Sequence, residues 1–397
     1  MDSGGTGPVT EARCRACGSG NLYLFHHQRG VPVNSCLLVG DETEAIRFPT
    51  GELSMAFCRT CGFIQNDSFD EKMTEYSDRY EETQAFSKRF VEFARGVATD
   101  WVDRHDLRGK RVIEIGCGKG EFLTYMADAG IGSGIGIDPG VDPARIDPGY
   151  EERLSWVPGW FDGSYGPLEA DAIVCRHTLE HVAEVQEFLT LIREALGDRL
   201  DTVLLFELPD TMRVLEEAAF WDVYYEHCSY FSEGSLTRLF QKCGFEVLGV
   251  TLAYDDQYLL LEARPAGPSG PGQSAPDDLE RLEKGVDHFS STYRDVVEAW
   301  QSRLSGVAAG GGRAVIWGAS SKGVSFLVSA GENVVAAVDI NPNKHGMYMA
   351  GTGHQIVAPE ELVEIAPELV VVMNPIYIEE ITADLARLGV EAEVIAV

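Results

Sequence analysis

The sequence is poor in basic residues and lacks long apolar runs. Only 32 lysines and arginines face 63 aspartates and glutamates, so the formal net charge is −31. Such a charge repels nucleic acid and anionic membranes at long range. No apolar run approaches the roughly 20 residues that span a bilayer, and residues 1–14 lack the basic and apolar regions of a signal peptide. We therefore expect a cytoplasmic protein that acts on a small molecule rather than on nucleic acid or a membrane.

The chain is not poor in apolar or aromatic residues, and this excludes a disordered protein. Its apolar fraction is 45% and its aromatic fraction is 10%, which are values of folded soluble proteins. A length of 397 residues predicts two or three domains. Residues 265–277 are rich in Pro, Gly and Ser and cannot form a core, so we expect a linker there.

Four of the nine cysteines form two CxxC pairs, and a glycine follows each pair. The members of the pairs are Cys14 and Cys17, and Cys58 and Cys61. Such turns let four thiolates converge on one zinc ion in a closed tetrahedral site, which is structural rather than catalytic. The separation of the pairs exceeds that of the usual zinc ribbon, and residues 36–50 can form a hairpin between them. Two disulfides or free thiols are the alternative, which a reducing cytoplasm disfavours.

A buried strand followed by a glycine-rich turn opens the central part of the chain. The turn has a GxGxG spacing, with Gly116, Gly118 and Gly120 as the glycines and Cys117 between the first two. Glycine lets the backbone approach a ligand closely and adopt positive φ. Glu114 precedes the turn by two residues. A sulfonium ligand tolerates such an acid, whereas the pyrophosphate of a dinucleotide would be repelled.

The next two strands also end in residues that suit an adenosyl group. Asp138, followed by Pro139, closes the second strand and can accept both ribose hydroxyls. Phe161 and Asp162 follow the third and can flank and hydrogen-bond an adenine. This series resembles the class I S-adenosylmethionine-dependent methyltransferases. The resemblance implies an α/β fold with a seven-stranded Rossmann-like sheet, a ligand at the carboxyl ends of its strands, and His177 at the end of the fourth strand, facing the cofactor.

The segment after the fourth strand also matches HxxEH, the signature of inverted zinc peptidases. His177, Glu180 and His181 occupy the three positions. A peptidase site needs both histidines on one face of a helix and a distant third ligand. Here the motif begins where a strand ends, so we expect the helix to start at Thr178 and to carry His181 in its first turns. We therefore favour the methyltransferase interpretation.

A second segment, VYYEHCSYFS at residues 223–232, surrounds one histidine with aromatic side chains. Together with the four cysteines, the methyltransferase core and the C-terminal part, it resembles the sugar C-methyltransferases that act on nucleotide-linked 4-keto deoxysugars. In that family a histidine removes the proton beside the ketone, and the enolate takes the methyl group. The residues that the resemblance implies for catalysis are His227 as the base, Glu226, Tyr225, His181, and either Tyr76 or Tyr80.

The chemistry asks for such residues independently of the resemblance. A proton beside a ketone requires a neutral base and a group that stabilises the enolate. Aromatic walls disfavour the charged form of a histidine, and tyrosines or a second histidine can donate to the oxyanion. The alternative for His227 is a structural histidine bonded to a backbone carbonyl.

One segment departs from the sugar C-methyltransferase pattern. Before the last core strand these proteins usually carry a His-Gly-Gly-Ser-like turn and an arginine, whereas this chain has Asp255 and Asp256. Two acids would disfavour a sugar diphosphate at that place. A different sugar, or an acceptor that is not a nucleotide sugar, therefore stays open.

The C-terminal part repeats the pattern of strand, turn and helix. Residues 313–327 contain a strand, a Gly-rich turn and a helix, and the next strand ends at Asp339. Such an edge can receive a phosphate at the amino end of the helix, with Lys322 assisting. Asn374 and Tyr377 follow a further strand. A purely structural lid is the alternative.

These patterns predict the domain organisation and leave three functions open. We predict a zinc-binding module at residues 1–70, a methyltransferase core at 71–264, a linker at 265–277 and a C-terminal Rossmann-like α/β domain at 278–397. The favoured function is an S-adenosylmethionine-dependent C-methyltransferase with a structural Zn²⁺ and a small-molecule acceptor. The alternatives are an O- or N-methyltransferase on a small metabolite, and a zinc-ribbon binding protein with a vestigial core.

Overall fold

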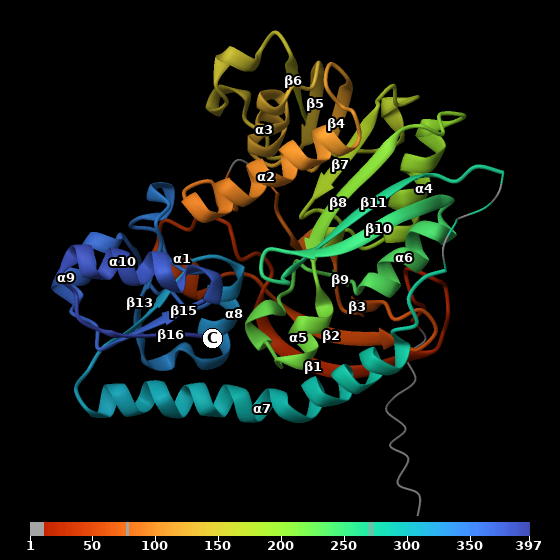
Figure 1. The fold of residues 1–397 in the computed structure, drawn as a ribbon. Helices are drawn as coiled ribbons and strands as arrows, with labels where there is room; N and C mark the ends of the chain where they lie inside the picture. Colours follow the sequence, from red (N-terminus) through yellow and green to blue (C-terminus); the bar gives the residue numbers. More distant parts are fainter. Residues whose placement is uncertain (1–11, 77–78, 269, 271, 273) are drawn as a thin grey trace, which may run out of the picture.

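The computed structural model describes residues 12–397 except residues 77, 78, 269, 271 and 273. Most of residues 1–14, which lack a signal-peptide pattern, and three positions of the expected linker therefore lie outside the described residues. The described chain forms three β-sheets that occupy separate regions of the molecule (Figure 1). None of its described helices is both long and apolar enough to cross a membrane.

The central sheet has seven strands in the order β10-β11-β8-β7-β4-β5-β6. Only β11 runs antiparallel to its neighbours. In chain order the strands are β4 (Arg111–Ile115), β5 (Ser133–Asp138), β6 (Leu154–Pro158), β7 (Ala172–Arg176), β8 (Val203–Pro209), β10 (Phe245–Ala253) and β11 (Tyr258–Pro265). Its main helices are α2 (Lys88–Arg104), α3 (Glu121–Ala129), α4 (Val185–Leu196), α5 (Thr211–Glu216) and α6 (Glu233–Lys242). The predicted α/β class with a seven-stranded Rossmann-like sheet is confirmed.

Local sequence explains where these elements begin and end. The central strands β7 and β8 are buried almost throughout, as continuous apolar runs in a parallel sheet require. Gly120 takes φ 84° just before α3, where glycine carries no steric penalty. Ser232 caps α6 in a reciprocal capping box with Ser235, and this cap fixes the end of the segment that carries His227.

A smaller antiparallel sheet combines the N-terminal part with two residues from the centre of the chain. Its strands are β1 (Leu22–Pro32), β2 (Thr50–Cys58), β3 (Ile64–Asn66) and β9 (Ser229–Tyr230). The expected hairpin at residues 36–50 is wrong, because β1 and β2 form the hairpin, and residues 36–49 lie in the connection between them together with α1 (Glu42–Ile46). The pairing of β9 with β3 holds the VYYEHCSYFS segment against the N-terminal part.

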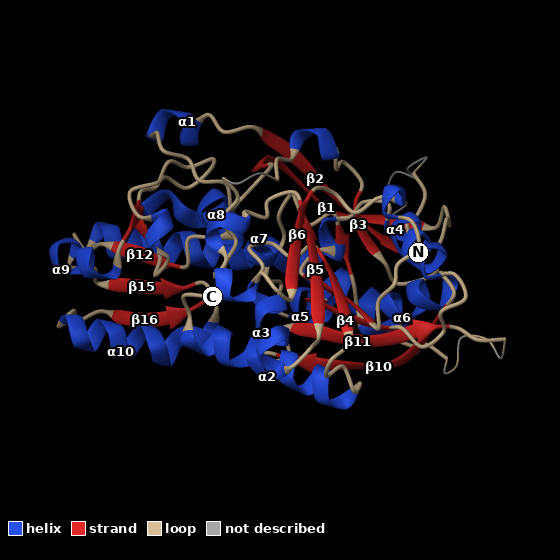
Figure 2. Ribbon diagram, turned by 90° about the horizontal axis from the view of Figure 1, so that it is seen from above, coloured by secondary structure: helices blue, strands red, loops and turns tan. Residues whose placement is uncertain are grey.

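The third sheet is parallel and has the order β14-β13-β12-β15-β16. Its strands are β12 (Ala314–Trp317), β13 (Val334–Val338), β14 (Ile356–Val357), β15 (Leu369–Val372) and β16 (Glu393–Ala396), and its helices are α8 (Ser321–Ala330), α9 (Leu362–Ile365) and α10 (Ile378–Leu388). The 31-residue helix α7 (Leu279–Ala309) runs along one side of the molecule beneath β1 and this sheet, and the view from above places the third sheet beside the central one (Figure 2).

Short 3₁₀ turns complete the chain and correct one expectation. They span Glu71–Met73, Pro143–Arg145, Pro148–Tyr150, Gly163–Tyr165, Leu179–His181, Phe220–Asp222, Gly331–Asn333, Pro342–Lys344, Pro359–Glu361 and Pro375–Tyr377. The expected helix from Thr178 is therefore a single 3₁₀ turn, and α4 begins only at Val185. The domain boundaries stay predictions.

Candidate active site

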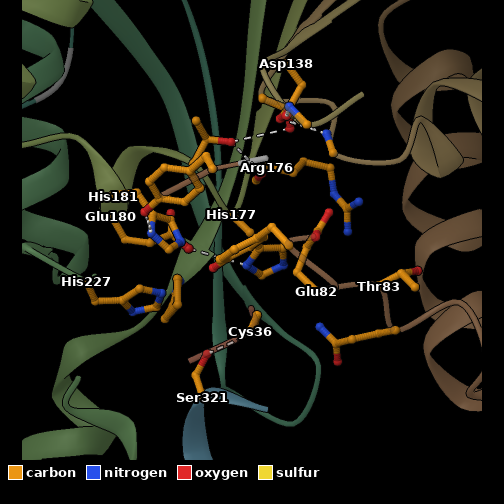
Figure 3. A pocket seen from close by; sticks show the side chains of 18 of the residues that line it. Cys36, Glu82, Thr83, Asp138, Arg176, His177, Glu180, His181, His227 and Ser321 are labelled. Carbon is orange, nitrogen blue, oxygen red and sulfur yellow. Dashed lines mark hydrogen bonds and ion pairs between the residues drawn. The ribbon is translucent and has the colours of Figure 1, made fainter. Parts of the chain in front are cut away.

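A cavity of about 1440 Å³ lies between the central sheet and the C-terminal sheet. Its wall contains the glycine turn after β4, the ends of β5 and β7, and the first residues of α8. The segment before α2 crosses it and contributes Tyr76, Tyr80, Glu82 and Thr83. The close-up shows His181, Glu180 and His227 on one side and Glu82 and Thr83 on the other (Figure 3).

The glycine turn adopts a backbone that only glycine takes without strain. Gly116, Gly118 and Gly120 have φ values of 73°, 52° and 84°. A Cβ atom on Gly116 would lie 1.9 Å from the Oγ1 atom of Thr178, so the turn packs directly on the segment that carries His177 and His181. Asp138 fixes the neighbouring loop, since its carboxylate accepts from the amides of Gly118 at 3.0 Å and Gly140 at 2.7 Å.

Buried acids surround this turn. Glu114 is 2% exposed, and its Oε2 atom has no hydrogen-bond partner among the described residues. Burial raises the pKa of Glu114 to about 8 and that of Glu82 to about 7, and it raises the pKa of Asp138 as well. No local pattern marks Glu82 in the sequence, because it lies in an irregular segment more than 30 residues before the turn. These groups favour a cationic ligand, which would stabilise their ionised forms.

The other residues expected around a cofactor also line the cavity. Cys117, Pro139, Phe161 and Asp162 all contribute to its wall. Phe161 stacks on Tyr165 with ring centroids 5.5 Å apart. Asp162 is exposed and accepts from the amide of Ser164 at 2.8 Å, which leaves the rest of its carboxylate open to a ligand.

His177 belongs to a buried ionic network at the ends of β7 and β8. Its Nε2 atom lies 2.8 Å from Oε1 of Glu207, which also accepts two hydrogen bonds from Arg176 at 2.8 and 2.9 Å. Burial alone would lower the pKa of His177, but the carboxylates of Glu180 and Glu207 raise it to about 9. Burial opposes ionisation of Glu207, yet Arg176 and His177 hold its pKa at about 2. A histidine engaged in this way lacks the free role that the HxxEH peptidase requires.

His227 faces the cavity and is 7% exposed. Its ring centroid lies 4.1 Å from that of Tyr224 and 4.7 Å from that of His181. Burial first, and then the nearby cationic groups, lower the pKa of His227 well below 6.5, so its imidazole is neutral. Within the described part of the chain it makes no side-chain hydrogen bond, which does not support the alternative of a structural histidine bonded to a carbonyl.

Both tyrosines that the sequence left open stand in the site. The hydroxyl of Tyr76 is 2.8 Å from Nδ1 of His181, and that of Tyr80 donates to Glu226 at 3.0 Å. Burial raises the pKa of both tyrosines well above 10, so both remain hydrogen-bond donors. The structure thus brings His181, His227, Tyr76 and Tyr80 together.

Glu226 and Tyr225 lie next to the cavity rather than on its wall. Glu226 is 1% exposed and accepts from the side chain of Asn34 and the amide of Ser35, each at 3.1 Å. The hydroxyl of Tyr225 accepts from the amide of Asp70 at 2.9 Å. Both residues therefore connect the segment to the N-terminal part. Tyr224, which is not among the residues predicted for catalysis, lines the cavity instead.

Lys322, the residue expected to assist a phosphate, and Asn374, expected at a strand end, are both engaged within the protein. The ammonium group of Lys322 lines the cavity but lies 3.0 Å from Asp222, and Asn374 exchanges hydrogen bonds with Gln257. Asp255 and Asp256 have φ values of 59° and 57°, are exposed and do not line the cavity. They lie at the tip of the β10-β11 hairpin, outside the cavity. The structure therefore does not support the expectation that they disfavour a sugar diphosphate.

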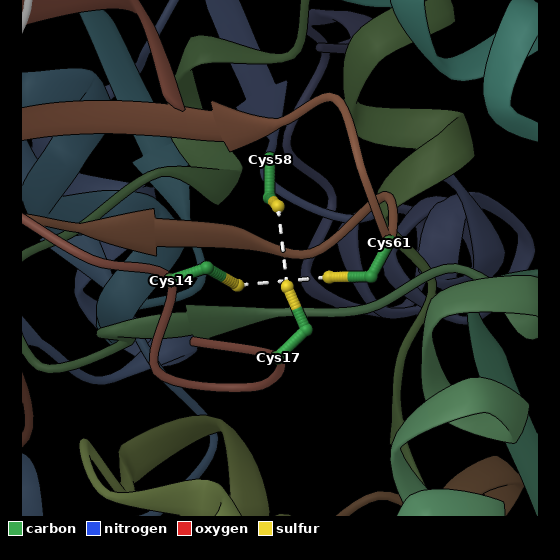
Figure 4. A group of neighbouring side chains, drawn as sticks. All are labelled: Cys14, Cys17, Cys58 and Cys61. Carbon is green, nitrogen blue, oxygen red and sulfur yellow. Dashed lines mark hydrogen bonds between the residues drawn. The ribbon is translucent and has the colours of Figure 1, made fainter. Parts of the chain in front are cut away.

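The four cysteines of the CxxC pairs converge at one point (Figure 4). The sulfur atoms of Cys14 and Cys61, and of Cys17 and Cys58, are 3.6 Å apart, and all four lie within 4.8 Å of one another. A tetrahedral zinc ion with Zn–S bonds of about 2.3 Å needs sulfur atoms about 3.8 Å apart. Hydrogen bonds from Cys14 and Cys61 lower the pKa of Cys58, and the same contacts raise the pKa of Cys61. The donor set fits one zinc ion, and none of the nine cysteines, all described, forms a disulfide.

Comparisons with known proteins agree with this geometry. Residues 87–250 match a family described as a methyltransferase domain, and residues 278–394 match the C-methyltransferase C-terminal domain. The C-methyltransferase NovU of Streptomyces niveus is 25% identical over 94% of this chain and 91% of its own length. The mitochondrial ubiquinone biosynthesis O-methyltransferase of Schizosaccharomyces pombe is 32% identical, over 23% of this chain and 36% of that protein.

A solved structure is similar over a shorter part of the chain. The N,N-8-amino-8-demethyl-D-riboflavin dimethyltransferase of Streptomyces davawensis has a TM-score of 0.36 and 23% identity, over 45% of this chain and 56% of that chain. The two family matches cover most of the central and C-terminal sheets, and NovU is similar over nearly the whole length. These matches identify the chain as a methyltransferase that is similar to a C-methyltransferase over nearly its whole length.

Proposed function

We propose that this enzyme transfers a methyl group from S-adenosylmethionine to the carbon beside the ketone of a keto deoxysugar, carried on a nucleotide or contained in a related natural-product precursor. His227 carries the proposal, because it is a neutral, buried imidazole on the cavity wall with no hydrogen-bond partner among the described residues. The similarity to a protein named a C-methyltransferase supports carbon, rather than oxygen or nitrogen, as the methylated atom.

The donor would lie across the ends of β4 and β5. S-adenosylmethionine supplies an electrophilic methyl group on a sulfonium when it is bound. Asp138 would accept the ribose hydroxyls, and Phe161 and Asp162 would flank the adenine. The unpaired carboxylate of Glu114 would neutralise positive charge on the methionyl part. His177 would face the donor as a fixed cation of the Glu207 network.

The acceptor would lie between His227 and the C-terminal sheet. His227 would remove the proton beside the ketone, and the resulting enolate would take the methyl group. Tyr76 and His181, which share a hydrogen bond of 2.8 Å, would supply a donor to the developing oxyanion. Tyr80 would hold Glu226 in place, and Glu226 and Tyr225 would position the loop that carries the base.

The four cysteines are proposed to hold a structural Zn²⁺. Four thiolates close the coordination shell, so the ion would take no part in the reaction. The zinc-loaded turns would anchor β2 and β3, and β3 pairs with β9 two residues after the base.

Hydrogen exchange at the acceptor carbon tests the proposal. A keto deoxysugar nucleotide is incubated in D₂O with the enzyme and S-adenosylhomocysteine, and deuterium beside the ketone is followed by NMR. The wild type is expected to exchange this proton, and His227→Ala to lose at least 100-fold of the rate, the usual contribution of a general base. The affinity for S-adenosylmethionine is expected to stay within twofold.

The control is His288→Ala, which removes an exposed histidine of α7 and is expected to exchange like the wild type. Exchange by His227→Ala at the wild-type rate would remove the base. An O- or N-methyltransferase would methylate its acceptor without any exchange at carbon.

A further inference from the structure

A second set of metal ligands lies on the cavity wall. The side chains of Glu180, His181 and His227 offer ligand atoms that all lie within 4.8 Å of one another. Glu180 and His181 belong to the 3₁₀ turn after β7, and His227 comes from the segment before β9. The three side chains point toward one another in the close-up (Figure 3).

Among these three residues, Glu180 is the one whose buried carboxylate lacks hydrogen-bond donors. It is 2% exposed, and neither carboxylate oxygen has a hydrogen-bond partner among the residues that the structure describes. Its one ion-pair contact, with Nδ1 of His177 at 3.6 Å, is too long for a hydrogen bond. Leaving a carboxylate buried without donors is costly unless a cation or a proton binds it. In the proposed reaction Glu180 has no role.

The imidazole rings of His181 and His227 can each offer a nitrogen atom to a metal ion. His227 lines the cavity and has no side-chain hydrogen bond in the described chain. Nδ1 of His181 lies 2.8 Å from the hydroxyl oxygen of Tyr76. In the tautomer in which Nδ1–H donates to this oxygen, Nε2 carries the lone pair that binds a metal ion. A second partner on the other ring nitrogen is the usual arrangement around metal-binding histidines. His177 contacts only one oxygen of Glu180, so the other is available.

We propose that Glu180, His181 and His227 bind a divalent transition-metal ion such as Zn²⁺, Ni²⁺ or Co²⁺. Two imidazoles and a carboxylate suit these ions, whereas Mg²⁺ prefers an oxygen-only shell. Metal bonds of about 2.0–2.2 Å require donor atoms roughly 3–3.5 Å apart. Glu180 can make this adjustment, because no hydrogen bond fixes its carboxylate.

Binding would have a consequence for catalysis. A metal ion on His227 takes the lone pair that removes the proton from the acceptor, so the ion would inhibit the enzyme in competition with the acceptor and not with the methyl donor. This consequence rests on the proposed function, whereas metal binding itself does not. The site would make the enzyme sensitive to free transition metals.

Calorimetric titration with Ni²⁺ tests the site on the full, tag-free chain with zinc in its four-cysteine site. Metal analysis before the titration is expected to find one zinc per chain, and the titration to find one further Ni²⁺. Glu180→Gln keeps the shape of the side chain and is expected to weaken Ni²⁺ binding at least 10-fold. His181→Asn is the second variant and is expected to do the same. Circular dichroism and binding of S-adenosylmethionine report whether each variant is folded.

The matched control is His27→Asn, which removes an exposed histidine that lies 3.4 Å from Glu52 and is expected to leave Ni²⁺ affinity within twofold of the wild type. Absence of a second equivalent, or unchanged affinity in both folded variants, would overturn the site. Binding that Glu180→Gln weakens, without inhibition of methyl transfer, would support the site and count against His227 as the base.

Discussion

Two strand-turn-helix units of this chain share a backbone arrangement but differ in their buried charges. In the central sheet, Asp138 at the end of β5 accepts from the amides of Gly118 at 3.0 Å and Gly140 at 2.7 Å. In the C-terminal sheet, Asp339 follows β13 and accepts from the amides of Ala319 at 3.0 Å and Asn341 at 2.9 Å. In both units a carboxylate after the second strand fixes the turn after the first.

The units differ in what balances that carboxylate. Lys344 is 3% exposed, lies 3.3 Å from Asp339 and donates to Ser320 Oγ at 2.7 Å. Asp138 has no ion pair among the described side chains, and the nearby Lys119 donates to the carbonyl of Gly140 at 3.2 Å. In the C-terminal unit Lys344 therefore balances the charge of Asp339. In the central unit the charge of Asp138 can instead be balanced by a cationic ligand. The backbone sets the shape of such a turn, and buried charges decide whether a cationic ligand binds there.

Replacing Asp138 or Asp339 singly by alanine is expected to give the largest difference between the two units. Asp138→Ala is expected to weaken binding of S-adenosylmethionine at least 100-fold, because hydrogen bonds to a charged group contribute about 1.5–3 kcal/mol each. Asp339→Ala is expected to leave this affinity within twofold but to lower the free energy of unfolding by about 3–5 kcal/mol, because Lys344 becomes an uncompensated buried charge. Calorimetry and urea unfolding measure the two effects. Equal losses of donor affinity in both variants would contradict the contrast.

The charge difference also predicts how donor binding depends on pH. Glu114 has a pKa of about 8 in the ligand-free site, and a cationic donor favours its ionised form. Binding therefore releases a proton below pH 8, so affinity is expected to rise between pH 6 and 8, by up to about tenfold per pH unit, and to level off above pH 8. Calorimetry in two buffers of different ionisation enthalpy measures the released proton.

Glu114→Gln is the matched variant for this pH dependence. It is expected to bind the donor roughly tenfold more weakly at pH 8. Its donor affinity is also expected to depend much less on pH, and Glu82, whose pKa is about 7, accounts for the pH dependence that is left. A slope that Glu114→Gln leaves unchanged would show that the proton comes from another group.

The same comparison shows what the sequence could predict. The glycine turn, the acids at strand ends and the CxxC pairs are local patterns, and each predicts its backbone without knowledge of distant residues. The fold class followed from them. Glu82 and Lys344 carry no such pattern, because their roles arise from burial beside residues of other elements. Glu180 does belong to a local pattern, HxxEH, but that pattern indicates a peptidase and does not predict the contact of Glu180 with His227. The sequence predicts Tyr225 for the site, whereas Tyr224 lines the cavity. This difference has a similar cause, because an irregular segment has no periodicity that indicates which side chain points inward.

The smallest expected effect concerns Ser321 at the start of α8. In the C-terminal unit this position contacts the N-terminal part of the protein rather than a bound ligand. Ser35 donates to Ser321 Oγ at 2.8 Å, and Ser35 also binds Glu226 beside the base. Ser321→Ala is expected to lower the free energy of unfolding by about 1 kcal/mol, the usual net value of one hydrogen bond, and to raise KM for the acceptor a few-fold while donor affinity stays constant. Ser291→Ala, on the exposed face of α7, is the control and is expected to change stability by less than about 0.5 kcal/mol. If Ser321→Ala instead weakened donor binding, the start of α8 would belong to the donor site, and the separation of the two units would not hold.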